Sequence, residues 1–400
     1  MNDDTRRVGL GVVGLGRGFT LMLPTLLRDR RFRLVAAMTP GVEARTAFER
    51  DFGGNSYETL EAMLDNPDVE AVYIASPHQF HCEQTIACAR AGRHVLVDKP
   101  LALSVEDGLA MVAATHAGGV HLVVGPSHSF DAPALAARRM VASNQFGAVR
   151  MIHSFNYTDF LYRPRRPEEL DSERGGGVIF SQAVHQVDVA RLLAGGLVTR
   201  VRGLTGNWDP DRPTEGAYNA QLEFANGAFA SLTYSGYGRF DSDEFMDWYG
   251  EPGHNKNPQD YGKARHLLKQ TEQHGSETAL KRTRNYGHVD TDRFTQCPLP
   301  PAHEHFGVVI ISCERADLRL KADGVMVFED HERRFEPVAP PVIPRVEVMD
   351  ELYDCVIHNR RPTHSGAFGL ATLEASLAIL ASAKSAETIS MKHQVGVADT

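Results

Sequence analysis

The chain has 400 residues, of which 42% are hydrophobic and 23% charged, and its formal net charge at pH 7 is −9. This length exceeds what one hydrophobic core usually fills, so two domains are expected. The acidic balance without a basic block argues against nucleic acid as a partner, and no long apolar run predicts a membrane span. The first residues, MNDDTRRVGLGVVGLG, do not read as a secretory signal. Five cysteines without a CxxC pair favour reduced thiols and a cytoplasmic protein.

Short apolar runs alternate with stretches of helical spacing up to Phe130. Five runs predict buried strands: 7–15, 32–40, 69–77, 94–100 and 120–127. Four intervening stretches predict helices: 19–29, 41–52, 81–92 and 105–118. This alternation predicts a Rossmann-type, doubly wound parallel sheet, so we expect residues 1–130 to form a domain that binds NAD(P).

The pattern changes after residue 130, where apolar and polar residues alternate between turn signals. Four segments predict strands of an open, mostly antiparallel sheet: 149–162, 198–208, 218–238 and 305–330. Three segments predict helices: 173–193, 346–362 and 366–386. We expect an α/β domain over 131–400 that binds substrate and supports oligomers, with a helix at 366–388 packing back on the first domain.

Residues 241–302 are rich in charge, glycine, proline and histidine and have little periodicity. They predict a long, mobile insertion between strands. Its histidines, with those just after it, are expected mostly at a solvated surface: His254, His266, His274, His288, His303 and His305.

The cofactor end begins with Gly14 and Gly16, directly after a predicted strand and before a predicted helix. The first glycine would allow the tight turn, and the second would let a pyrophosphate approach the helix N-terminus. Phe19 occupies the third glycine position. Thr39 stands at the end of the second strand, where a carboxylate would favour NAD over NADP. With Arg45 nearby, we expect NAD to bind and NADP to be weakly discriminated against.

The segment AGRHVLVDKPLAL, residues 91–103, resembles the strand and turn of the glucose–fructose oxidoreductase, inositol dehydrogenase and MocA family. Asp98 replaces the usual glutamate, whereas Lys99 and Pro100 match. The resemblance extends over nearly the whole chain through SPHQFH at 76–81, the GGGxxxSxxxH spacing at 175–185 and a long match at 361–380. It implies a Rossmann domain, a second α/β domain and hydride transfer between a nicotinamide and a hydroxyl-bearing carbon.

The resemblance implies that Lys99 binds substrate and nicotinamide and that His185 is the general base. Ser181 takes the place of the family's aspartate, four residues before His185, and we expect the two on one helix face. An imidazole can accept a hydroxyl proton near neutrality, and an ammonium can stabilise the developing alkoxide. Without that aspartate, His185 is expected to be weakly basic. Taken alone, His185 is equally consistent with a structural histidine, and Asp188 is expected to be structural.

The expected cofactor contacts lie at the glycine turn and at the strand ends: Gly14, Gly16, Arg17, Gly18, Phe19, Thr39, Ser76, Pro77, His78, His81, Asp98, Lys99 and Pro100. His78 and His81 have an HxxH spacing, but no third ligand in a matching context accompanies them, so no metal site is expected.

Three arginines precede the site helix: Arg163, Arg165 and Arg166. Guanidinium groups suit bidentate binding of a carboxylate, although by residue type alone a solvated loop or an ion pair between domains is the simpler interpretation. The segments GLGRGFTLMLP (14–24), SHSFD (127–131) and RPRRPEELD (163–171) resemble a family branch, the phthalate-type dehydrogenases of carboxylated aromatic cis-dihydrodiols.

That resemblance implies a small carboxylated diol of phthalate, isophthalate or chlorobenzoate type, oxidised to a dihydroxy aromatic compound or a catechol. It implies substrate contacts at Ser181, His128, Arg163, Arg165 and Arg166. A sugar or cyclitol dehydrogenase of the same family and a non-catalytic binding protein are the alternatives. A homo-oligomer, dimer or tetramer, is expected.

Overall fold

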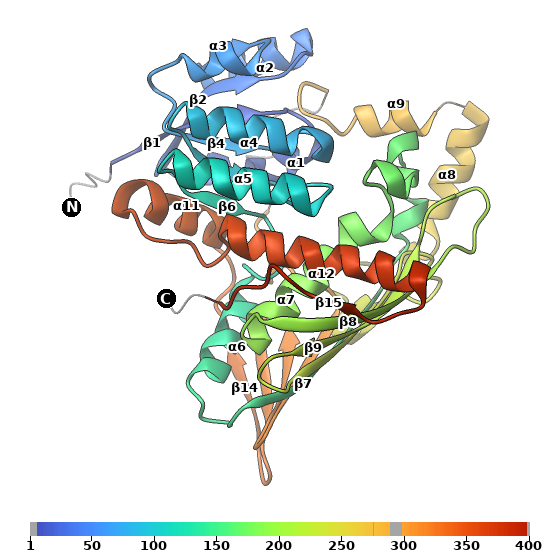
Figure 1. Ribbon diagram of the computed structural model, residues 1–400. Coiled ribbons are helices and arrows are strands. Elements are labelled where there is room, and N and C mark those ends of the chain that lie inside the picture. Colours follow the sequence, from blue (N-terminus) through green and yellow to red (C-terminus); the bar gives the residue numbers. More distant parts are fainter. Residues whose placement is uncertain (1–5, 275, 289–297, 398–400) are drawn as a thin grey trace.

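The structure is a computed structural model that describes residues 6–274, 276–288 and 298–397. Two sheets organise it, one in each half of the chain (Figure 1). The first sheet has six parallel strands: β1 (Val8–Val13), β2 (Phe32–Met38), β3 (Asn55–Tyr57), β4 (Ala71–Ile74), β5 (His94–Val97) and β6 (Leu122–Val124).

The strand order β3-β2-β1-β4-β5-β6 confirms the predicted doubly wound sheet, with its switch point between β1 and β4. Its helices are α1 (Arg17–Arg28), α2 (Val42–Phe52), α3 (Leu60–Leu64), α4 (His81–Arg90) and α5 (Val105–Ala117). The central strands are wholly buried, as a sheet covered on both faces requires. The edge strand β3 and helix α3 were not predicted, because β3 is only three polar or half-buried residues.

The second sheet has nine strands: β7 (Val149–Tyr157), β8 (Val198–Gly206), β9 (Ala217–Phe224), β10 (Phe229–Ser235), β11 (Val308–Cys313), β12 (Asp317–Lys321), β13 (Gly324–Phe328), β14 (Arg333–Pro337) and β15 (Ile389–Ser390). Their order is β14-β13-β12-β11-β7-β10-β9-β8-β15, and β7 pairs in parallel with β10 while the other pairs are antiparallel. The mostly antiparallel sheet is therefore confirmed. Buried and exposed residues alternate along β9, so one face of the sheet stays open, and association through that face remains a prediction.

Helix α12 (Gly366–Ser385) lies between the two sheets (Figure 1). A Cβ on Gly108 of α5 would lie 2.8 Å from Leu370, and one on Gly203 of β8 would lie 2.7 Å from the Ile379 carbonyl oxygen. By length and composition α12 could cross a membrane, but 72% of its apolar window is buried inside the protein. Outside the insertion, this half also contains α6 (Ala132–Ala142), α7 (Val184–Ala194) and α11 (Val346–His358).

The insertion at 241–302 is structured where it is described, contrary to the expectation of a mobile segment. It contains α8 (Lys263–His274) and α9 (Glu277–Arg282), drawn in gold in Figure 1. Tyr286 is 1% exposed and donates a 2.7 Å hydrogen bond to Asp51 of α2, with its ring 5.2 Å from that of Phe19. These tertiary contacts, which periodicity cannot reveal, attach the insertion to the parallel-sheet half.

Ion pairs also attach the insertion to the antiparallel-sheet half. Lys281 pairs with Glu169, and Glu277 pairs with Arg212 at 3.0 Å. The histidine prediction was wrong for His303 and His305, which are both 7% exposed and bonded to backbone carbonyls. His254, His266 and His288 are exposed, and the side chain of His274 lies outside the described residues.

Arg191 of α7 is fully buried and bonds across to the α12 region. Its guanidinium donates to the Phe368 carbonyl and the Thr372 hydroxyl, both at 2.8 Å, and to the Val395 carbonyl at 3.1 Å. Burial lowers the pKa of Arg191 to about 10, although Asp188 and Glu374 oppose the shift. The arginine stays charged at neutral pH, and these buried acceptors stabilise its charge.

Replacing Arg191 with leucine should lower the free energy of unfolding by about 3 kcal/mol, because several buried acceptors lose their donor. Urea unfolding followed by circular dichroism measures this. Arg200→Ala removes an arginine whose side chain is 57% exposed and paired with Glu223, and should cost about 0.5 kcal/mol or less. Equal losses in the two variants would contradict the role assigned to Arg191.

Candidate active site

A cleft of about 550 Å³ opens at the carboxyl ends of the parallel strands, where Gly14, Gly16, Thr39, Ser76 and Pro77 line it. Gly14 has φ +88°, and a Cβ there would lie 2.8 Å from Ser76. Nothing lies within 4 Å of a Cβ built on Gly16, and α1 begins there without a side-chain cap. The open backbone and the uncapped N–H groups fit the pyrophosphate of a dinucleotide.

Three residues of the glycine turn that were predicted to contact the cofactor have other neighbours in the structure. Phe19 is fully buried against Phe52 and Tyr286, so its side chain does not reach the cleft. Gly18 leaves room for Asp98, whose Oδ2 would lie 2.6 Å from a Cβ there, and Arg17 lines a neighbouring cavity. These three residues therefore determine the shape of the cleft and do not themselves line it.

His81 and His78 lie next to the loops that follow the strands of the parallel sheet. His81 is fully buried, and its ring nitrogens lie 3.1 Å from the Ser76 carbonyl and 3.0 Å from the Pro100 carbonyl. Burial, with the charges of His81 and Lys99, lowers the pKa of His78 to about 3. Both rings are neutral at physiological pH, and their contacts are those of packing and loop positioning.

The second half of the chain contributes a wall to the same cleft, which the sequence did not indicate. Its lining residues from this half are Arg166, Arg282, Asn285, Tyr286 and His288. Arg166 lines this cleft and pairs with Glu168 and Glu169, and its contact with the substrate stays a prediction.

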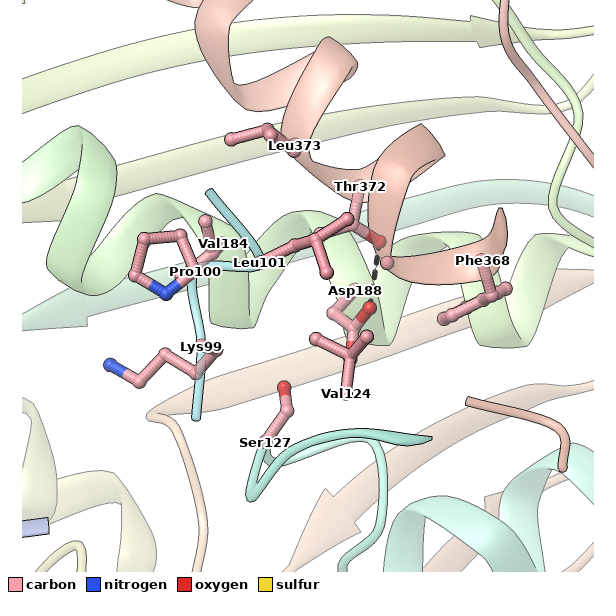
Figure 2. Close-up of a pocket in the computed structure, with 11 residues that line it drawn as sticks. Lys99, Pro100, Leu101, Val124, Ser127, Val184, Asp188, Phe368, Thr372 and Leu373 are labelled. Carbon is pink, nitrogen blue, oxygen red and sulfur yellow. Dashed lines mark hydrogen bonds between the residues drawn. The ribbon is translucent and has the colours of Figure 1, made fainter. Parts of the chain in front are cut away.

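Lys99 lies two residues after the end of β5, and its side chain reaches the turn at Ile179–Ala183 that precedes α7. Its Nζ donates a 2.8 Å hydrogen bond to the Ser181 carbonyl oxygen. Burial lowers the pKa of Lys99, and the charges of Asp98 and Glu251 oppose that shift. Figure 2 shows its side chain extending away from the Asp188–Thr372 hydrogen bond, near Ser127. An ammonium with a lowered pKa can both stabilise an alkoxide and exchange a proton.

His185 is 6% exposed and its Nδ1 lies 3.3 Å from the Ser127 hydroxyl. Burial, together with the charges of Lys99, His128 and Arg345, holds its pKa well below the ordinary value. His185 is therefore weakly basic, as expected. The reason is its burial among cationic groups, in addition to the missing aspartate. A neutral imidazole in this position is available as a proton acceptor.

Ser181 does not share a regular helix with His185. Residues Ile179–Ala183 form a π-helical turn, and α7 begins at Val184. The Ser181 hydroxyl donates to the Gly177 carbonyl, so its own carbonyl, and not its hydroxyl, meets Lys99. Gly177 has φ +79° and approaches Glu215, where a Cβ would clash at 2.0 Å. Gly177 thus lets the chain pass close to Glu215 just before the π-helical turn.

Asp188 is structural, as its contacts show: it accepts hydrogen bonds from Ser129 and from Thr372, the latter at 2.7 Å. Together with Lys99 and Ser127 it lines a small internal cavity of about 20 Å³ (Figure 2).

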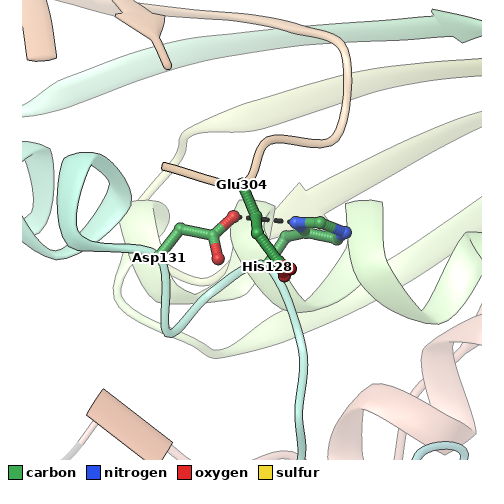
Figure 3. Close-up of side chains that lie close together, drawn as sticks. All are labelled: His128, Asp131 and Glu304. Atoms are coloured by element: carbon green, nitrogen blue, oxygen red, sulfur yellow. Dashed lines mark hydrogen bonds and ion pairs between the residues drawn. The ribbon is translucent and has the colours of Figure 1, made fainter. Parts of the chain in front are cut away.

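His128 stands beside His185, with ring centroids 4.7 Å apart. Its Nδ1 bonds to Asp131 at 2.7 Å, and Figure 3 shows Glu304 next to this pair. Burial opposes protonation, but Asp131 and Glu251 raise the pKa of His128 to about 10, so the ring carries a positive charge. Ligand atoms of His128, Asp131 and Glu304 lie within 4.8 Å of one another, as a metal site would need. However, Arg345 Nε donates to both Glu304 carboxylate oxygens at 2.9 Å. The positive charges of Arg345 and His128 therefore compensate the carboxylates of Glu304 and Asp131, and the cluster forms an ion-pair network.

A cavity of about 590 Å³ lies next to this network and is lined by Arg163 and Arg165. Seven cationic side chains line it against four carboxylates, in a chain of net charge −9. The cationic residues are Arg17, Arg163, Arg165, Lys256, Lys281, Arg284 and Arg345, and the acidic ones are Asp243, Glu251, Asp260 and Glu304. This concentration of positive charge favours an anionic ligand.

The structure adds Arg345 and Glu251 to the site. Arg345 adopts φ +53° before α11, where it lines the cavity, and Glu304 holds it charged by raising its pKa against the effect of burial. Glu251 comes from the insertion. Neither belongs to a recognisable motif, and only the tertiary fold brings them near Lys99 and His185.

Two family models match the chain. Residues 8–126 match the oxidoreductase family with an NAD-binding Rossmann fold, and residues 134–254 match the GFO/IDH/MocA C-terminal domain. The chain is 45% identical, over 94% of both chains, to a 1-carboxy-3-chloro-3,4-dihydroxycyclohexa-1,5-diene dehydrogenase of Comamonas testosteroni.

Solved structures share the fold over nearly the full length. A protein of Bordetella bronchiseptica RB50 is 39% identical, with a TM-score of 0.90 over 96% of this chain and 100% of that one. The WlbA dehydrogenase of Bordetella pertussis, solved with NADH and UDP-GlcNAcA, is 22% identical with a TM-score of 0.66, over 97% of this chain and 99% of that one, which supports the fold alone. The glycine-turn cleft, the Lys99–His185 pair and these matches agree: the chain belongs to the GFO/IDH/MocA family and is an NAD(P)-dependent oxidoreductase.

Proposed function

We propose that the protein oxidises a carboxylated aromatic cis-dihydrodiol, of phthalate, isophthalate or chlorobenzoate type, to the dihydroxy aromatic compound or a catechol. The observation that carries this proposal is the cationic cavity beside Lys99 and His185, which suits an anionic ring diol. The 45% identity to a dehydrogenase of a carboxylated dihydroxycyclohexadiene supports it.

The chemistry assigned to the chain's own residues is proton transfer and charge stabilisation. Gly14, Gly16, Thr39, Ser76 and Pro77 would hold the dinucleotide, which supplies the hydride acceptor when bound. The substrate C–H bond gives up a hydride while its O–H bond loses a proton. Neutral His185 accepts that proton, and the Lys99 ammonium stabilises the oxygen as its charge develops. The resulting ketone becomes aromatic when the neighbouring hydroxyl-bearing carbon loses its proton and the ketone oxygen gains one, which gives the dihydroxy aromatic compound. Where that carbon carries the carboxylate and no hydrogen, CO2 leaves in place of the proton and a catechol forms.

The carboxylate of the substrate would bind to the arginines of the cavity. Burial lowers the pKa of Arg165 to about 10, so its charge is held at a cost that a nearby anion offsets. Its Nε is buried and has no acceptor among the described residues, while its Nη2 donates to Phe160 at 2.7 Å. Among the residues that the structure describes, Arg163 forms ion pairs with Asp159, at 3.0 Å, and with Glu251, at 4.0 Å. Both guanidiniums therefore have capacity for a planar carboxylate.

A substrate panel tests the proposal. Carboxylated cis-dihydrodiols should have kcat/KM values roughly tenfold to hundredfold above that of the uncharged benzene cis-dihydrodiol, because the carboxylate gains charge-assisted hydrogen bonds. Formation of reduced nicotinamide, followed by absorbance, measures the rates. Faster turnover of inositols or aldoses would favour the alternative of a sugar or cyclitol dehydrogenase.

The same assay tests the catalytic pair. Lys99→Met and His185→Ala should each lower kcat by about a hundredfold or more while changing the dissociation constant of NAD⁺ little. His266→Ala, at an exposed position of α8, is the matched control. Near-normal turnover in both site variants would overturn the assignment.

Cofactor preference tests the role of Thr39. Thr39 itself offers no carboxylate to oppose a 2′-phosphate, although Glu43 also lines the cleft, and Arg45 donates to the Thr39 and Pro40 carbonyls at 2.8 and 2.9 Å. NAD⁺ and NADP⁺ should give kcat/KM values within about tenfold of each other, and Thr39→Asp should selectively lower that for NADP⁺ by about tenfold or more. Thr46→Asp, exposed on α2, is the control. Strong exclusion of NADP⁺ by the unmodified protein would refute this reading of Thr39.

The pH dependence follows from the lowered pKa values of the pair. Because His185 has its pKa well below 6.5, it stays neutral as the pH falls through 6.5, so kcat/KM should stay constant there. Because the pKa of Lys99 is below 10.5, the alkaline loss of activity should begin below that value. Measuring kcat/KM from about pH 5 to about pH 10 tests both limbs. An acidic limb centred near 6.5 would contradict the environment assigned to His185.

A further inference from the structure

Glu251 is a carboxylate placed between the cationic cavity and the catalytic pair. Its Oε1 lies 3.7 Å from His128 Nε2, and its Oε2 lies 4.0 Å from Arg163 Nη1. These separations are longer than those of a direct hydrogen bond, so Glu251 still has acceptor capacity. Its side chain is 36% exposed, and it lines the cavity, so a ligand there can reach it.

The carboxylate is ionised throughout the working pH range. Burial acts against ionisation, but the charges of His128, Arg163 and Lys99 lower the pKa of Glu251 to about 2. An ionised carboxylate accepts hydrogen bonds and donates none. It therefore attracts a hydroxyl group and repels a second carboxylate at the same place.

We propose that Glu251 is an orienting residue for the diol acid: it accepts a hydrogen bond from a substrate hydroxyl beside His128 and turns the substrate's carboxylate away. This inference rests on the proposed function and names a residue and a mode of selection within the same site. The carboxylate is then left to bind the arginine side of the cavity. A diol acid bound in this direction brings its hydroxyl-bearing carbon towards the Lys99 and His185 end.

The alternative is that Glu251 only fixes the insertion. Its backbone already does this, because its carbonyl accepts a 3.2 Å hydrogen bond from the His305 N–H. A fixing role predicts that loss of the carboxylate weakens every ligand alike. An orienting role predicts opposite effects on ligands with and without hydroxyls, because only the repulsion acts on a simple carboxylate.

The test uses the NAD⁺-loaded protein, with benzoate as a carboxylate that has no hydroxyl groups. Glu251→Gln should lower the benzoate dissociation constant about fivefold, as expected when one like charge about 4 Å away is removed in a water-like dielectric. The same variant should lower kcat for the carboxylated cis-dihydrodiol about tenfold, with little rise in KM, because reversed binding becomes allowed. Calorimetry and steady-state kinetics give the two readouts.

Two controls separate charge from structure. Glu251→Asp keeps the charge and should leave benzoate binding within about twofold of the unmodified protein. Glu244→Gln removes an exposed carboxylate of the insertion that is not part of the cavity lining, and both readouts should stay unchanged. Parallel weakening of benzoate binding and turnover in Glu251→Gln, or no change in either, would overturn the proposal.

The benzoate-binding measurement does not depend on whether the protein catalyses the proposed reaction. If the unmodified protein oxidises no carboxylated dihydrodiol, the proposed function fails, whereas the benzoate measurement still decides whether Glu251 repels a ligand carboxylate.

Discussion

The hydrogen bond from the Lys99 ammonium to the Ser181 carbonyl oxygen, 2.8 Å long, joins the parallel sheet to the helix that carries His185. Lys99 follows β5, and Ser181 lies in the π-helical turn before α7, so this contact brings the two halves of the chain together at the reacting position. A buried ammonium needs acceptors and opposite charge around it. Asp98, the Ser181 carbonyl and Glu251 provide them, and the lowered pKa of Lys99 shows that they compensate burial only in part.

The electrostatics of the site follow from that constraint. His128 is charged because Asp131 and Glu251 face it, whereas His185, between Lys99 and His128, is held neutral by the same cations and by burial. Two histidines in contact therefore take different charge states, and only the neutral one can accept a proton. The excess of cationic groups on the cavity wall extends this field into the cavity, which suits the anionic diol that we propose as substrate.

Much of this arrangement could be predicted from sequence, because it depends on local signals. Apolar runs bounded by helical stretches specify the parallel sheet, and the family resemblance of the DKP turn and the GGGxxxSxxxH spacing points to Lys99 and His185. The remainder depends on long-range contacts. Strand β3 is too short and too polar to show an alternating hydrophobic pattern. The prediction that Ser181 and His185 share one helix face assumed regular helical spacing, which the π-helical turn at Ser181 interrupts. Tyr286, Glu251 and Arg345 belong to segments without motifs, and only docking of the insertion and of α11 brings them to the clefts.

A crystal structure of the NAD⁺-loaded protein with a bound carboxylated ring, such as phthalate, tests the central claim most directly. The account predicts the ligand carboxylate within hydrogen-bond distance of Arg163, Arg165 or Arg345, with the opposite side of the ring facing Lys99 and His185. A ring bound with its carboxylate at Glu251, or bound outside the cationic cavity, would contradict it.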